Sequence, residues 1–540
     1  MPDTATSMHA DALIVGAGPA GALAASLLAE NGFKVVCLEQ GDWMNPRDYP
    51  GVRPDWELLE QKSWSPNPNI RARPVDYPCE TSDSDFDPLM FAAVGGSTIM
   101  FRAHWVRLLP SDFRVRSLDG VADDWPFTYE DLVPYYDAID ELVGTAGLAG
   151  DPAYPPGTPP PLPPHPIGLA GRKVAQGLNQ LSWHWWPAPN AIASRRYRGL
   201  NPCARYGTCS TGCPNGSKAS FDLVVWPQAI RAGVRLVTHA RVRNITVNNK
   251  GLATGAIYVD SDGIERQQTA DVVIVAANAI GTPRILLLSK SAQFPDGLAN
   301  SSGLVGKRLM THPNTRVVGI FDEEFPSWQG PFGQLIQSMQ FYETDVSRGF
   351  VRGAKWGLLP SQSPINLGIS ALLDNRGLEA KQPHEAVRDH IGHSVQWGIL
   401  LEDLPSSSNR VVLDDNVTDS DGIPAPKIVS HLSENLKRNM EFQIARAKEA
   451  LEAAGARRVY DTGLSPTRSH SMGTTVMGQD PRTSVVDQYG RSHDVQNLYI
   501  FGASTFPTGG AANPTATLCA ITLRAVDNLI AHRRLQRVPT

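Results

Sequence analysis

The sequence predicts an α/β fold in which a Rossmann-like domain is combined with a second, discontinuous domain built on an antiparallel sheet backed by helices. Three observations support this prediction. The chain opens with an apolar strand, a glycine-rich turn and a helix. Its 540 residues exceed the length at which one hydrophobic core stops growing. Strand-like segments between residues 314 and 428 lead into a strongly amphipathic helix.

The first elements form a strand, a turn, a helix and a second strand. The apolar run ALIV at residues 12–15 ends at the turn GAGPAG, residues 16–21, and an Ala- and Leu-rich helix continues to about Asn31. Residues 33–38 form the second apolar strand, which Glu39 closes. This order is typical of a βαβ nucleotide-binding unit.

Each glycine of the G-x-G-x-x-G turn has a physical role in such a unit. Gly16 permits the tight turn, Gly18 lets the backbone approach a pyrophosphate, and Gly21 lets helix and strand close. The helix N-terminus around Ala20 presents amides and a favourable dipole to the phosphates. A carboxylate at Glu39 suits ribose hydroxyls and repels a 2′-phosphate, so FAD and NAD fit this unit and NADP does not.

The remaining elements follow in order along the chain. Residues 152–166 hold too much proline for a helix or a central strand, so we expect a semi-rigid excursion over the surface. We then expect strand regions at residues 234–247, 253–259 and 271–276, followed by a helix at 282–289. A second sheet region at 314–428 leads to a long helix at 433–454, a buried strand at 497–501 and a last helix at 514–531.

The composition excludes some classes of function. Hydrophobic residues make up 41% and charged residues 19% of the chain, as in an ordinary globular protein, and the net charge of -5 offers no basic surface for nucleic acid. No apolar run reaches the roughly 18 residues that a membrane span requires. The first residues lack the basic region of a secretory signal, so we expect a cytoplasmic protein.

Six segments in a fixed order resemble the glucose-methanol-choline (GMC) family of flavoprotein oxidoreductases. Within that family, the segment GGSTIMFRAHWVRLLPSDF is most similar to the large subunit of gluconate 2-dehydrogenase and related sugar dehydrogenases. Alcohol oxidases of aminoglycoside biosynthesis belong to the same family. The segments are residues 16–21 with Glu39, 93–113, 277–289, 303–313, 470–478 and 501–517.

The resemblance implies FAD, held without a covalent bond in a discontinuous domain. We expect the FAD-binding domain to comprise residues 8–125, 203–313 and 466–535. Residues 126–202 form a Pro- and Trp-rich excursion, and residues 314–465 form the substrate-binding domain. The glycines at 95 and 96 allow close approach to a planar ring, and the two hydroxyls that follow offer donors to its edge. The expected FAD contacts are Gly16, Gly18, Ala20, Gly21, Glu39, Gly95, Gly96, Ser97, Thr98, Val242, Ala277, Ala503, Pro514 and Thr515.

Oxidation of an alcohol by hydride transfer requires a base beside the hydroxyl, and histidine has a suitable pKa. The resemblance assigns this role to His470, and it assigns to Asn513 the stabilisation of the developing alkoxide. Val476 departs from the pattern of sugar-oxidising relatives, which commonly carry an arginine there. We expect His104 to be a partly buried histidine satisfied by hydrogen bonds, and His312 to be structural.

Three of the six cysteines are clustered in the sequence. Cys203, Cys209 and Cys213 have the spacing C-x5-C-x3-C in a loop rich in Gly and Pro. Three thiolates are the ligand set of a 3Fe-4S cluster, and cytochrome-linked sugar dehydrogenases of the family carry a cluster on a similar loop. A loop with buried thiols or one disulfide and no metal is the alternative. We expect small buried hydrophobic side chains at Cys37, Cys79 and Cys519.

The predicted function is the oxidation of a sugar, polyol or aminosugar hydroxyl to a carbonyl, with dioxygen or a carrier as electron acceptor. Alternatives are an electron-relay subunit that passes electrons through a cluster to a protein partner, and an NAD-dependent dehydrogenase. Four acids within residues 80–87 form either a solvated turn or an entrance that attracts a cationic substrate. Trp183, Trp185 and Trp186 either stack on sugar rings or pack in a core.

Overall fold

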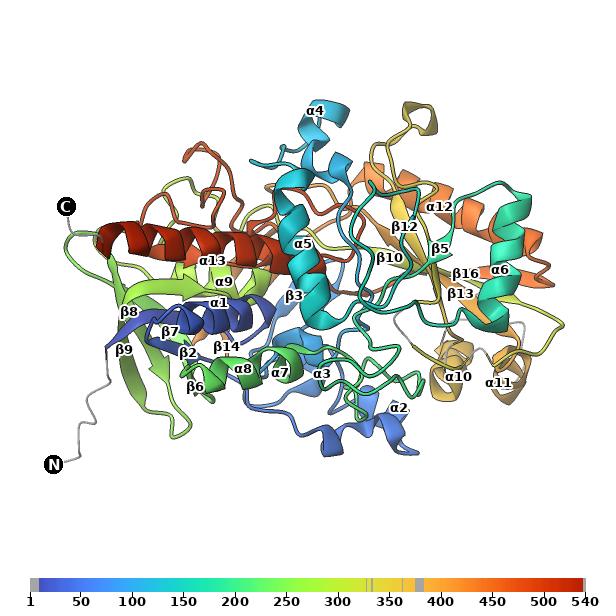
Figure 1. Ribbon diagram of the computed structural model, residues 1–540, viewed down its shortest axis with the longest axis horizontal. Coiled ribbons are helices and arrows are strands. Elements are labelled where there is room, and N and C mark those ends of the chain that lie inside the picture. Colours follow the sequence, from blue (N-terminus) through green and yellow to red (C-terminus); the bar gives the residue numbers. More distant parts are fainter. Residues whose placement is uncertain (1–8, 327, 332–333, 362, 374–382, 538–540) are drawn as a thin grey trace.

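Two large sheets lie at opposite ends of an elongated molecule, and helix α5 (Tyr129–Val143) stands between them (Figure 1). The structure is a computed structural model that describes residues 9–537, apart from 327, 332–333, 362 and 374–382. The α/β fold class predicted from the sequence is confirmed.

The first sheet contains the predicted Rossmann-like unit. Its strands lie in the order β6, β2, β1, β9, β8 and β7, and β18 also pairs with β9. Pairing is parallel from β6 to β9 and between β9 and β18, whereas β7, β8 and β9 form an antiparallel meander. The bounds are β1 Ala10–Val15, β2 Val35–Leu38, β6 Arg235–Val237, β7 Arg241–Val247, β8 Ala253–Val259, β9 Glu265–Val275 and β18 Leu498–Ile500.

Helices cover this sheet, and the first and last long helices of the chain lie side by side. Helix α1 (Pro19–Glu30) packs against α8 (Trp226–Arg231) and α13 (Thr515–Arg537), which lies beside it in Figure 1. Small buried side chains, among them Ala22, Ala24 and Ala25, let α1 approach its neighbours closely. The N-terminal glycine turn and the C-terminal motif thus meet in one place.

The second sheet has six strands, in the order β16, β10, β13, β12, β11 and β5, and all of its pairs are antiparallel. Helix α12 (Glu434–Ala453) packs against α6 (Gly168–Gln180) and the sheet. The hydroxyl of Ser433 caps α12 by accepting from the Leu436 amide at 3.2 Å, so the helix begins where the sequence predicts. The strand bounds are β5 Trp186–Pro187, β10 Asn314–Ile320, β11 Ile336–Ser338, β12 Ala354–Leu359, β13 Ser394–Leu401 and β16 Arg458–Leu464.

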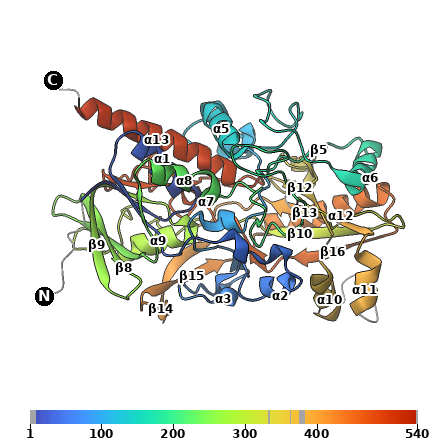
Figure 2. The ribbon, with the colours of Figure 1, turned by 60° about the horizontal axis from the view of Figure 1, so that its bottom comes forward.

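The prediction of one sheet region over residues 314–428 was wrong in its last part. Helices α10 (Pro364–Leu373) and α11 (Pro383–His390) interrupt it, and the hairpin of β14 and β15 lies beside α9 (Figure 2). The cause is a buried carboxylate in the hairpin turn: Asp419 binds Arg284 of α9 at 2.6 Å and Arg241 at 3.2 Å. The acidic segment adds a third strand, β3, to this hairpin, so the segment is a strand and not a turn. The bounds are β3 Glu80–Ser84, β14 Arg410–Thr418, β15 Pro424–Ser430 and α9 Asn278–Leu288.

The shorter elements connect these layers. The domain limits given above stay a prediction. Among the helices of the described ranges, none is both long and apolar enough to cross a bilayer. The shorter elements are α2 Trp56–Glu60, α3 Pro68–Arg71, α4 Val115–Asp119, α7 Phe221–Val224, β4 Asp87–Pro88 and β17 Thr467–Arg468.

A buried ion cluster joins the second sheet to the segment that precedes α4. Arg352 is 1% exposed and binds Glu402 at 2.8 Å, Asp119 at 3.2 Å and, by an ion pair as well, Asp112. Burial raises the pKa of Asp112 to about 7, and the positive charge of Arg352 opposes that rise. The carboxylates of this cluster therefore depend on Arg352 for their charge compensation.

We expect Arg352→Met to lower the free energy of unfolding by roughly 3–5 kcal/mol, because it leaves buried carboxylates without their cation. Thermal and urea unfolding of the purified variant measure this loss. The control is Arg482→Met, since solvent screens the exposed pair of Arg482 with Asp480 and its loss is expected to leave the stability almost unchanged. Equal stability of the two variants would contradict the role of the cluster.

Candidate active site

The N-terminal glycine turn leaves open space at the start of α1. A Cβ on Gly16 would lie 2.6 Å from the carbonyl oxygen of Ala276, and a Cβ on Gly21 would lie 1.9 Å from that of Gly16. Only glycine fits at these two positions. A Cβ on Gly18 would meet no atom within 4 Å. This free space faces the helix N-terminus, where the amides and the dipole favour phosphate groups.

Glu39 is buried at the end of β2 and holds the turn. One carboxylate oxygen accepts from the Ala17 amide at 2.8 Å and the other accepts from the Gly41 amide at 2.9 Å. Burial raises the pKa of Glu39, although these backbone donors act in the opposite direction. The carboxylate thus borders the expected dinucleotide site, and its contact with ribose stays a prediction.

Other residues predicted to bind the cofactor surround the same space. Ala277 follows Ala276, which touches Gly16, and Ala20 lies in the first turn of α1. Val242 of β7 comes two residues after Ala240, whose amide donates to the Glu39 carbonyl at 2.9 Å. The structure therefore brings these residues to the edge of the glycine turn.

The loop at residues 95–98 packs directly on the glycine turn. A Cβ on Gly96 would lie 2.9 Å from the Cα of Gly18, and both glycines have positive φ, 92° for Gly95 and 57° for Gly96. The Thr98 hydroxyl donates to the Gly95 carbonyl at 2.5 Å and accepts from the Phe221 amide at 3.0 Å. Thr98 therefore holds the loop in shape. The Ser97 hydroxyl accepts from the Phe91 amide at 3.1 Å and can still donate its hydrogen.

The two C-terminal motifs run side by side. Amides of residues 473, 475 and 477 donate to carbonyls of residues 503, 504 and 505 at 3.1, 2.8 and 2.9 Å. The buried hydroxyls of Thr475 and Ser504 have no hydrogen-bond partner among the described residues. Ala503 lies in this ladder, and Pro514 and Thr515 begin α13 beyond it. The predicted FAD contacts of the C-terminal half thus all lie in the second of these two motifs.

The side chains of His470, His312 and Asn513 lie close together at these two motifs. The Nδ1 atoms of His470 and His312 are 2.9 Å apart, and Asn513 Nδ2 is 3.4 Å from His470 Nε2. His470 and Asn513 were predicted together, whereas His312 was expected to be structural and its contact with His470 was missed. The only sequence signal was its place in a motif of the family, GLVGKRLMTHP, because residues 312 and 470 are far apart in the chain.

The Gly510 carbonyl fixes where the protons lie. His312 Nε2 is 2.7 Å from this oxygen, which can only accept, so Nε2 carries the hydrogen. Neutral His312 then has its lone pair on Nδ1, and His470 must donate to it from its own Nδ1. The lone pair of neutral His470 is therefore on Nε2, beside Asn513.

Both histidines are neutral near pH 7. Burial lowers the pKa of His312 to about 4 and lowers the pKa of His470 well below its ordinary value, and the charge of Lys355 acts in the same direction on each. His470 and Asn513 nevertheless keep part of their surface accessible. Together these properties are expected of side chains that line an enclosed space. His470 has a φ of +65°, in the left-handed region.

The loop that carries Gly510 is held by the buried ion cluster. Gly510 has a φ of +57°, and a Cβ there would lie 2.8 Å from the Tyr342 hydroxyl. That hydroxyl accepts from the Ala511 amide at 3.0 Å and donates to Asp112 at 2.8 Å. Asp112 in turn is bound by Arg352. The position of Asn513 therefore depends on a charged group in the second sheet region.

The expected partly buried His104, satisfied by hydrogen bonds, is only partly matched. His104 is 5% exposed, and the Pro189 carbonyl is the acceptor nearest to its ring and opposes the fall of its pKa, although the geometry falls short of a regular hydrogen bond. Burial lowers its pKa well below the ordinary value, and charges on Lys355 and His470 act in the same direction. Lys355, which sequence reasoning also missed, is 0% exposed.

The cysteine loop lies beside the segment that follows Gly96. Lys218 Nζ donates to the carbonyls of Ile99, Phe101 and Cys209 at 2.8, 2.9 and 2.6 Å. Burial raises the pKa of the Cys203 thiol to about 12, and the other two thiols of the loop add to this. Within the described residues, no three His, Cys, Asp or Glu side chains are grouped so as to hold a metal ion. The structure therefore gives the cluster no support. Cys37, Cys79 and Cys519 are buried, as predicted.

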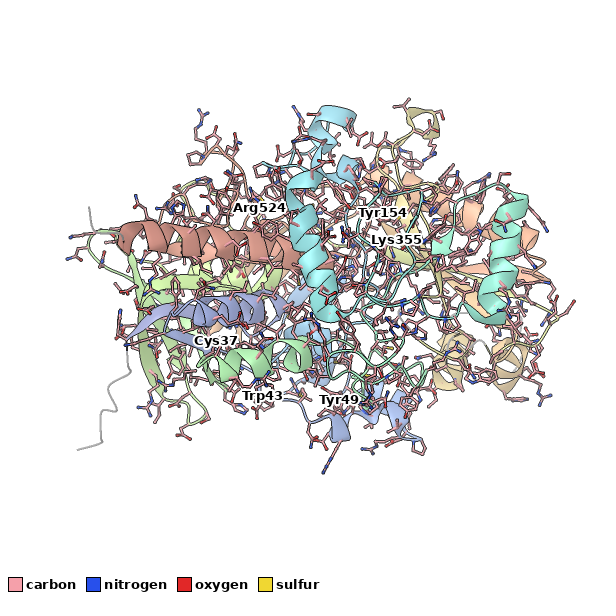
Figure 3. All side chains as sticks on the ribbon, in the orientation of Figure 1. Cys37, Trp43, Tyr49, Tyr154, Lys355 and Arg524 are labelled. Carbon is pink, nitrogen blue, oxygen red and sulfur yellow. The ribbon has the colours of Figure 1, made fainter. Side chains whose placement is uncertain are left out.

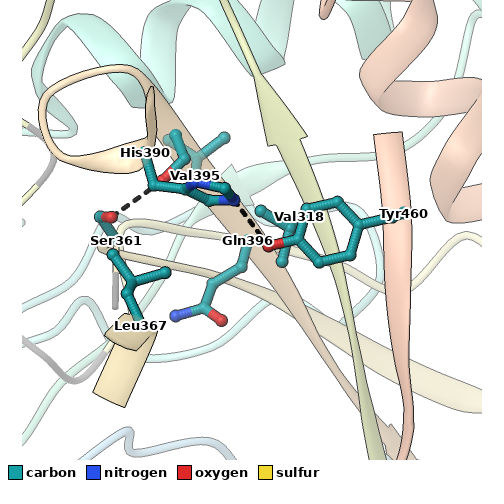
Figure 4. A pocket seen from close by; sticks show the side chains of 8 residues that line it. Val318, Ser361, Leu367, His390, Val395, Gln396 and Tyr460 are labelled. Carbon is teal, nitrogen blue, oxygen red and sulfur yellow. Dashed lines mark hydrogen bonds between the residues drawn. The ribbon is translucent and has the colours of Figure 1, made fainter. Parts of the chain in front are cut away.

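The remaining candidates lie outside this site. Trp183 packs against Phe341 and Trp356 with ring centroids 4.9 and 6.3 Å apart, so it belongs to a core. The acidic segment lies beside basic side chains of the protein: Glu80 is 3.5 Å from Lys427, and Asp83 and Asp85 are 3.3 and 3.7 Å from His431. The small hollow in Figure 4 lies beside α11, where His390 Nε2 is 2.8 Å from the Tyr460 hydroxyl.

Comparison with known proteins agrees with this geometry. Residues 10–314 and 405–522 match the models of the N-terminal and C-terminal parts of the GMC oxidoreductases. The chain is 39% identical to the 2-methyl-1,2-propanediol dehydrogenase of Mycolicibacterium austroafricanum, over 97% of this chain and 96% of the relative. It is 29% identical to the fructose dehydrogenase large subunit of Gluconobacter japonicus, over 97% and 98%. Its fold resembles that of Aspergillus oryzae formate oxidase, with a TM-score of 0.64 and 17% identity over 97% and 99% of the chains.

We expect Gly18→Val to fold but to purify with little bound FAD, because the new side chain enters the space that the turn leaves free. The flavin absorbance per protein after gel filtration measures this. Gly368→Val is the control, since a Cβ on Gly368 of α10 also meets no atom within 4 Å. The role of the turn would be contradicted if both variants retained full flavin.

Proposed function

The chain belongs to the GMC oxidoreductase family, and on this basis we propose that it oxidises a hydroxyl of a sugar, polyol or aminosugar to a carbonyl, with His470 as the general base. It is an oxidoreductase that acts on CH–OH groups. The observation that carries the proposal is the lone pair of His470 Nε2, which lies 3.4 Å from the amide nitrogen of Asn513. A base and a donor on one side of an enclosed space are what alcohol oxidation requires.

The residues present fit FAD as the cofactor. The free space in front of Gly18 suits a pyrophosphate, and the Gly95–Gly96 backbone offers a close approach to a planar ring. The unpartnered buried hydroxyls of Thr475 and Ser504 are available to a bound group. When bound, FAD would accept the hydride from the carbinol carbon. We propose that it is held without a covalent bond, because the spacing between Gly96 and His104 does not match the covalent pattern of some relatives.

The protein groups would act on the substrate hydroxyl in a defined way. His470 Nε2 accepts the hydroxyl proton, while its Nδ1 hydrogen stays bonded to His312. The Asn513 amide hydrogen donates to the oxygen as negative charge develops on it. The bond from His312 to the Gly510 carbonyl keeps the base in its productive tautomer throughout.

The alternative function, an electron relay through an iron–sulfur cluster to a protein partner, rests on the spacing of the three thiols and on the similar loop of cytochrome-linked relatives. In the residues that the structure describes, these thiols are not grouped as a metal site. Iron and acid-labile sulfide analysis of anaerobically purified protein separates the two functions.

We expect His470→Ala to keep its FAD and to lower the rate of flavin reduction by substrate roughly 10²- to 10⁴-fold, as is usual for the loss of a positioned base. Anaerobic stopped-flow absorbance measures the rate. His390→Ala is a matched control, because His390 is also buried but bonds to Tyr460 outside the site. Unchanged reduction in the His470 variant would refute the assignment.

The pKa of His470 determines the pH dependence of the same rate. Histidine is a base only when unprotonated, so activity is lost as the pH falls through its pKa. Burial lowers that pKa well below the ordinary value. We therefore expect the rate of flavin reduction to be constant from about pH 8 to pH 6 and to fall only in more acidic solution. A loss of half the rate at about pH 6.5 would show instead an unperturbed histidine.

A further inference from the structure

Gly510 and Ala511 share the peptide group on which the histidine pair depends. The carbonyl of this group, on Gly510, accepts from His312 Nε2 at 2.7 Å. The amide of the same group, on Ala511, donates to the Tyr342 hydroxyl at 3.0 Å. A trans peptide group is planar and rigid, and its carbonyl and its amide point in opposite directions. The Tyr342 hydroxyl therefore holds the end of the group that lies opposite His312.

Tyr342 reaches this peptide group from the other half of the molecule. It comes shortly after β11 of the six-stranded sheet, and its neighbour Phe341 belongs to the core of that sheet. Tyr342 itself is 0% exposed and belongs to the core that contains the first sheet. Figure 3 shows that side chains fill the space between α5 and β12, where Tyr154 and Lys355 are labelled. Tyr342 thus connects the two cores.

The hydroxyl of Tyr342 directs its own hydrogen at a carboxylate. Burial raises the pKa of Tyr342 well above its ordinary value, so the hydroxyl keeps this hydrogen. Because the Ala511 amide donates to its oxygen, Tyr342 donates to Asp112 Oδ2, at 2.8 Å. The Leu109 amide donates to the same carboxylate oxygen at 2.7 Å, and Arg352 forms an ion pair with the other oxygen. Each of these partners is a donor, as a carboxylate acceptor requires.

A second contact with Asp112 holds the other side of Gly510. The Thr508 hydroxyl donates to the backbone carbonyl of Asp112 at 2.9 Å and accepts from Trp125 Nε1 at 2.7 Å. A Cβ on Gly510 would lie 2.9 Å from Asp112 Oδ2, so the turn packs directly on this side chain. Residues 508–511 are therefore fixed on both sides of the carbonyl that His312 uses.

These contacts join into one chain of hydrogen bonds in which every donor points the same way. The chain runs, in the direction of donation, through His470, His312, the 510–511 peptide group, Tyr342 and Asp112. Hydrogen bonds in such a series polarise and strengthen one another. One end of the series is a carboxylate, and the other end is the imidazole that has its lone pair on Nε2.

We propose that Tyr342 is a positioning residue for the base. By holding the 510–511 peptide group it keeps the hydrogen of His312 on Nε2, and this in turn keeps the lone pair of His470 on Nε2. In the reaction the carbinol loses a hydride to FAD and its hydroxyl proton to His470 Nε2, while the hydrogens of the chain stay on their donor atoms. The proposal rests on the proposed function, because Tyr342 takes part in the reaction only through His470.

Loss of the Tyr342 hydroxyl leaves the Ala511 amide without its acceptor. The peptide group is then free to turn, because Gly510 has no side chain that resists rotation. Without a fixed acceptor at Nε2, the hydrogen of His312 occupies Nδ1 in part of the molecules. In those molecules His470 accepts at Nδ1 and carries its hydrogen on Nε2, so it has no lone pair for a substrate hydroxyl.

The test determines the tautomers directly, without a substrate. The protein is labelled with ¹⁵N-histidine, loaded with FAD and kept at about pH 8, above the pKa of about 7 to which burial raises the Asp112 carboxyl. Long-range proton–nitrogen correlation NMR identifies the ring nitrogen that carries the hydrogen, and the variants His312→Leu and His470→Ala assign the two signals. In the wild-type protein we expect the hydrogen of His470 on Nδ1 and that of His312 on Nε2.

We expect Tyr342→Phe to populate the second tautomer of both histidines and to slow flavin reduction about tenfold, the order of magnitude of one hydrogen bond. The reductant is whichever of D-glucose, D-glucitol and 1,2-propanediol reduces the wild-type flavin fastest without dioxygen. Tyr460→Phe is the matched control, since the Tyr460 hydroxyl bonds to His390 outside the site. This control should keep the wild-type tautomers and a rate within about twofold of the wild type.

A double-mutant cycle tests whether Tyr342 acts through His312. In His312→Leu there is no imidazole for the peptide group to orient, so adding Tyr342→Phe should slow flavin reduction by less than about twofold more. A further fall of about tenfold in the double variant would mean that Tyr342 acts by a separate route, and it would overturn the proposal.

The wild-type spectrum gives a result even if Tyr342→Phe does not fold. A wild-type His470 that carries its hydrogen on Nε2 would overturn the proposal, as would unchanged tautomers in folded Tyr342→Phe. These outcomes differ from a failure of the proposed function. Normal flavin reduction in His470→Ala would count against His470 as the base, whereas the tautomers show by themselves whether Tyr342 orients the histidine pair.

Discussion

The site depends on one hydrogen bond, from His312 Nε2 to the carbonyl oxygen of Gly510 at 2.7 Å. Because a carbonyl can only accept, this bond sets the tautomer of His312, and through the 2.9 Å contact between the Nδ1 atoms it sets the tautomer of His470. The proposed base thus has its lone pair on Nε2 without help from a substrate. The acceptor that orients the imidazole is a neutral carbonyl, which keeps both histidines neutral in a buried place where a charge would be unfavourable.

The same carbonyl connects the chemistry to the stability of the fold. Gly510 has room for no Cβ, and the next amide binds the Tyr342 hydroxyl, which binds Asp112. Arg352 holds that carboxylate from the side of the second sheet. The ion cluster therefore has two roles. It joins the sheet regions, and it fixes the position of the loop that carries Asn513. A change in the charge of this cluster would reach the reaction site through two hydrogen bonds.

Patterns within one segment were enough to predict the parts of the site that local geometry determines. The glycine turn and Glu39 follow from a short motif whose residue types are required by backbone space, whereas His470 and Asn513 were chosen through the resemblance to a family. The contacts missed are those between distant residues. His312 was placed by a carbonyl almost 200 residues away. The hairpin of β14 and β15 left the predicted sheet because Asp419 binds Arg284. Lys355 looks like any strand lysine in the sequence, although it is fully buried.

The backbone of His470 has a consequence for how this chain can change. Its φ of +65° is a conformation that glycine adopts freely and that costs most other residues about 1 kcal/mol or more. Replacement by glycine would relieve that strain and remove the imidazole at the same time. Mutants enriched only for heat resistance should therefore include some that have lost catalysis at this position. If His470 acts as proposed, selection for turnover must keep it in place against a small and constant preference of folding for glycine.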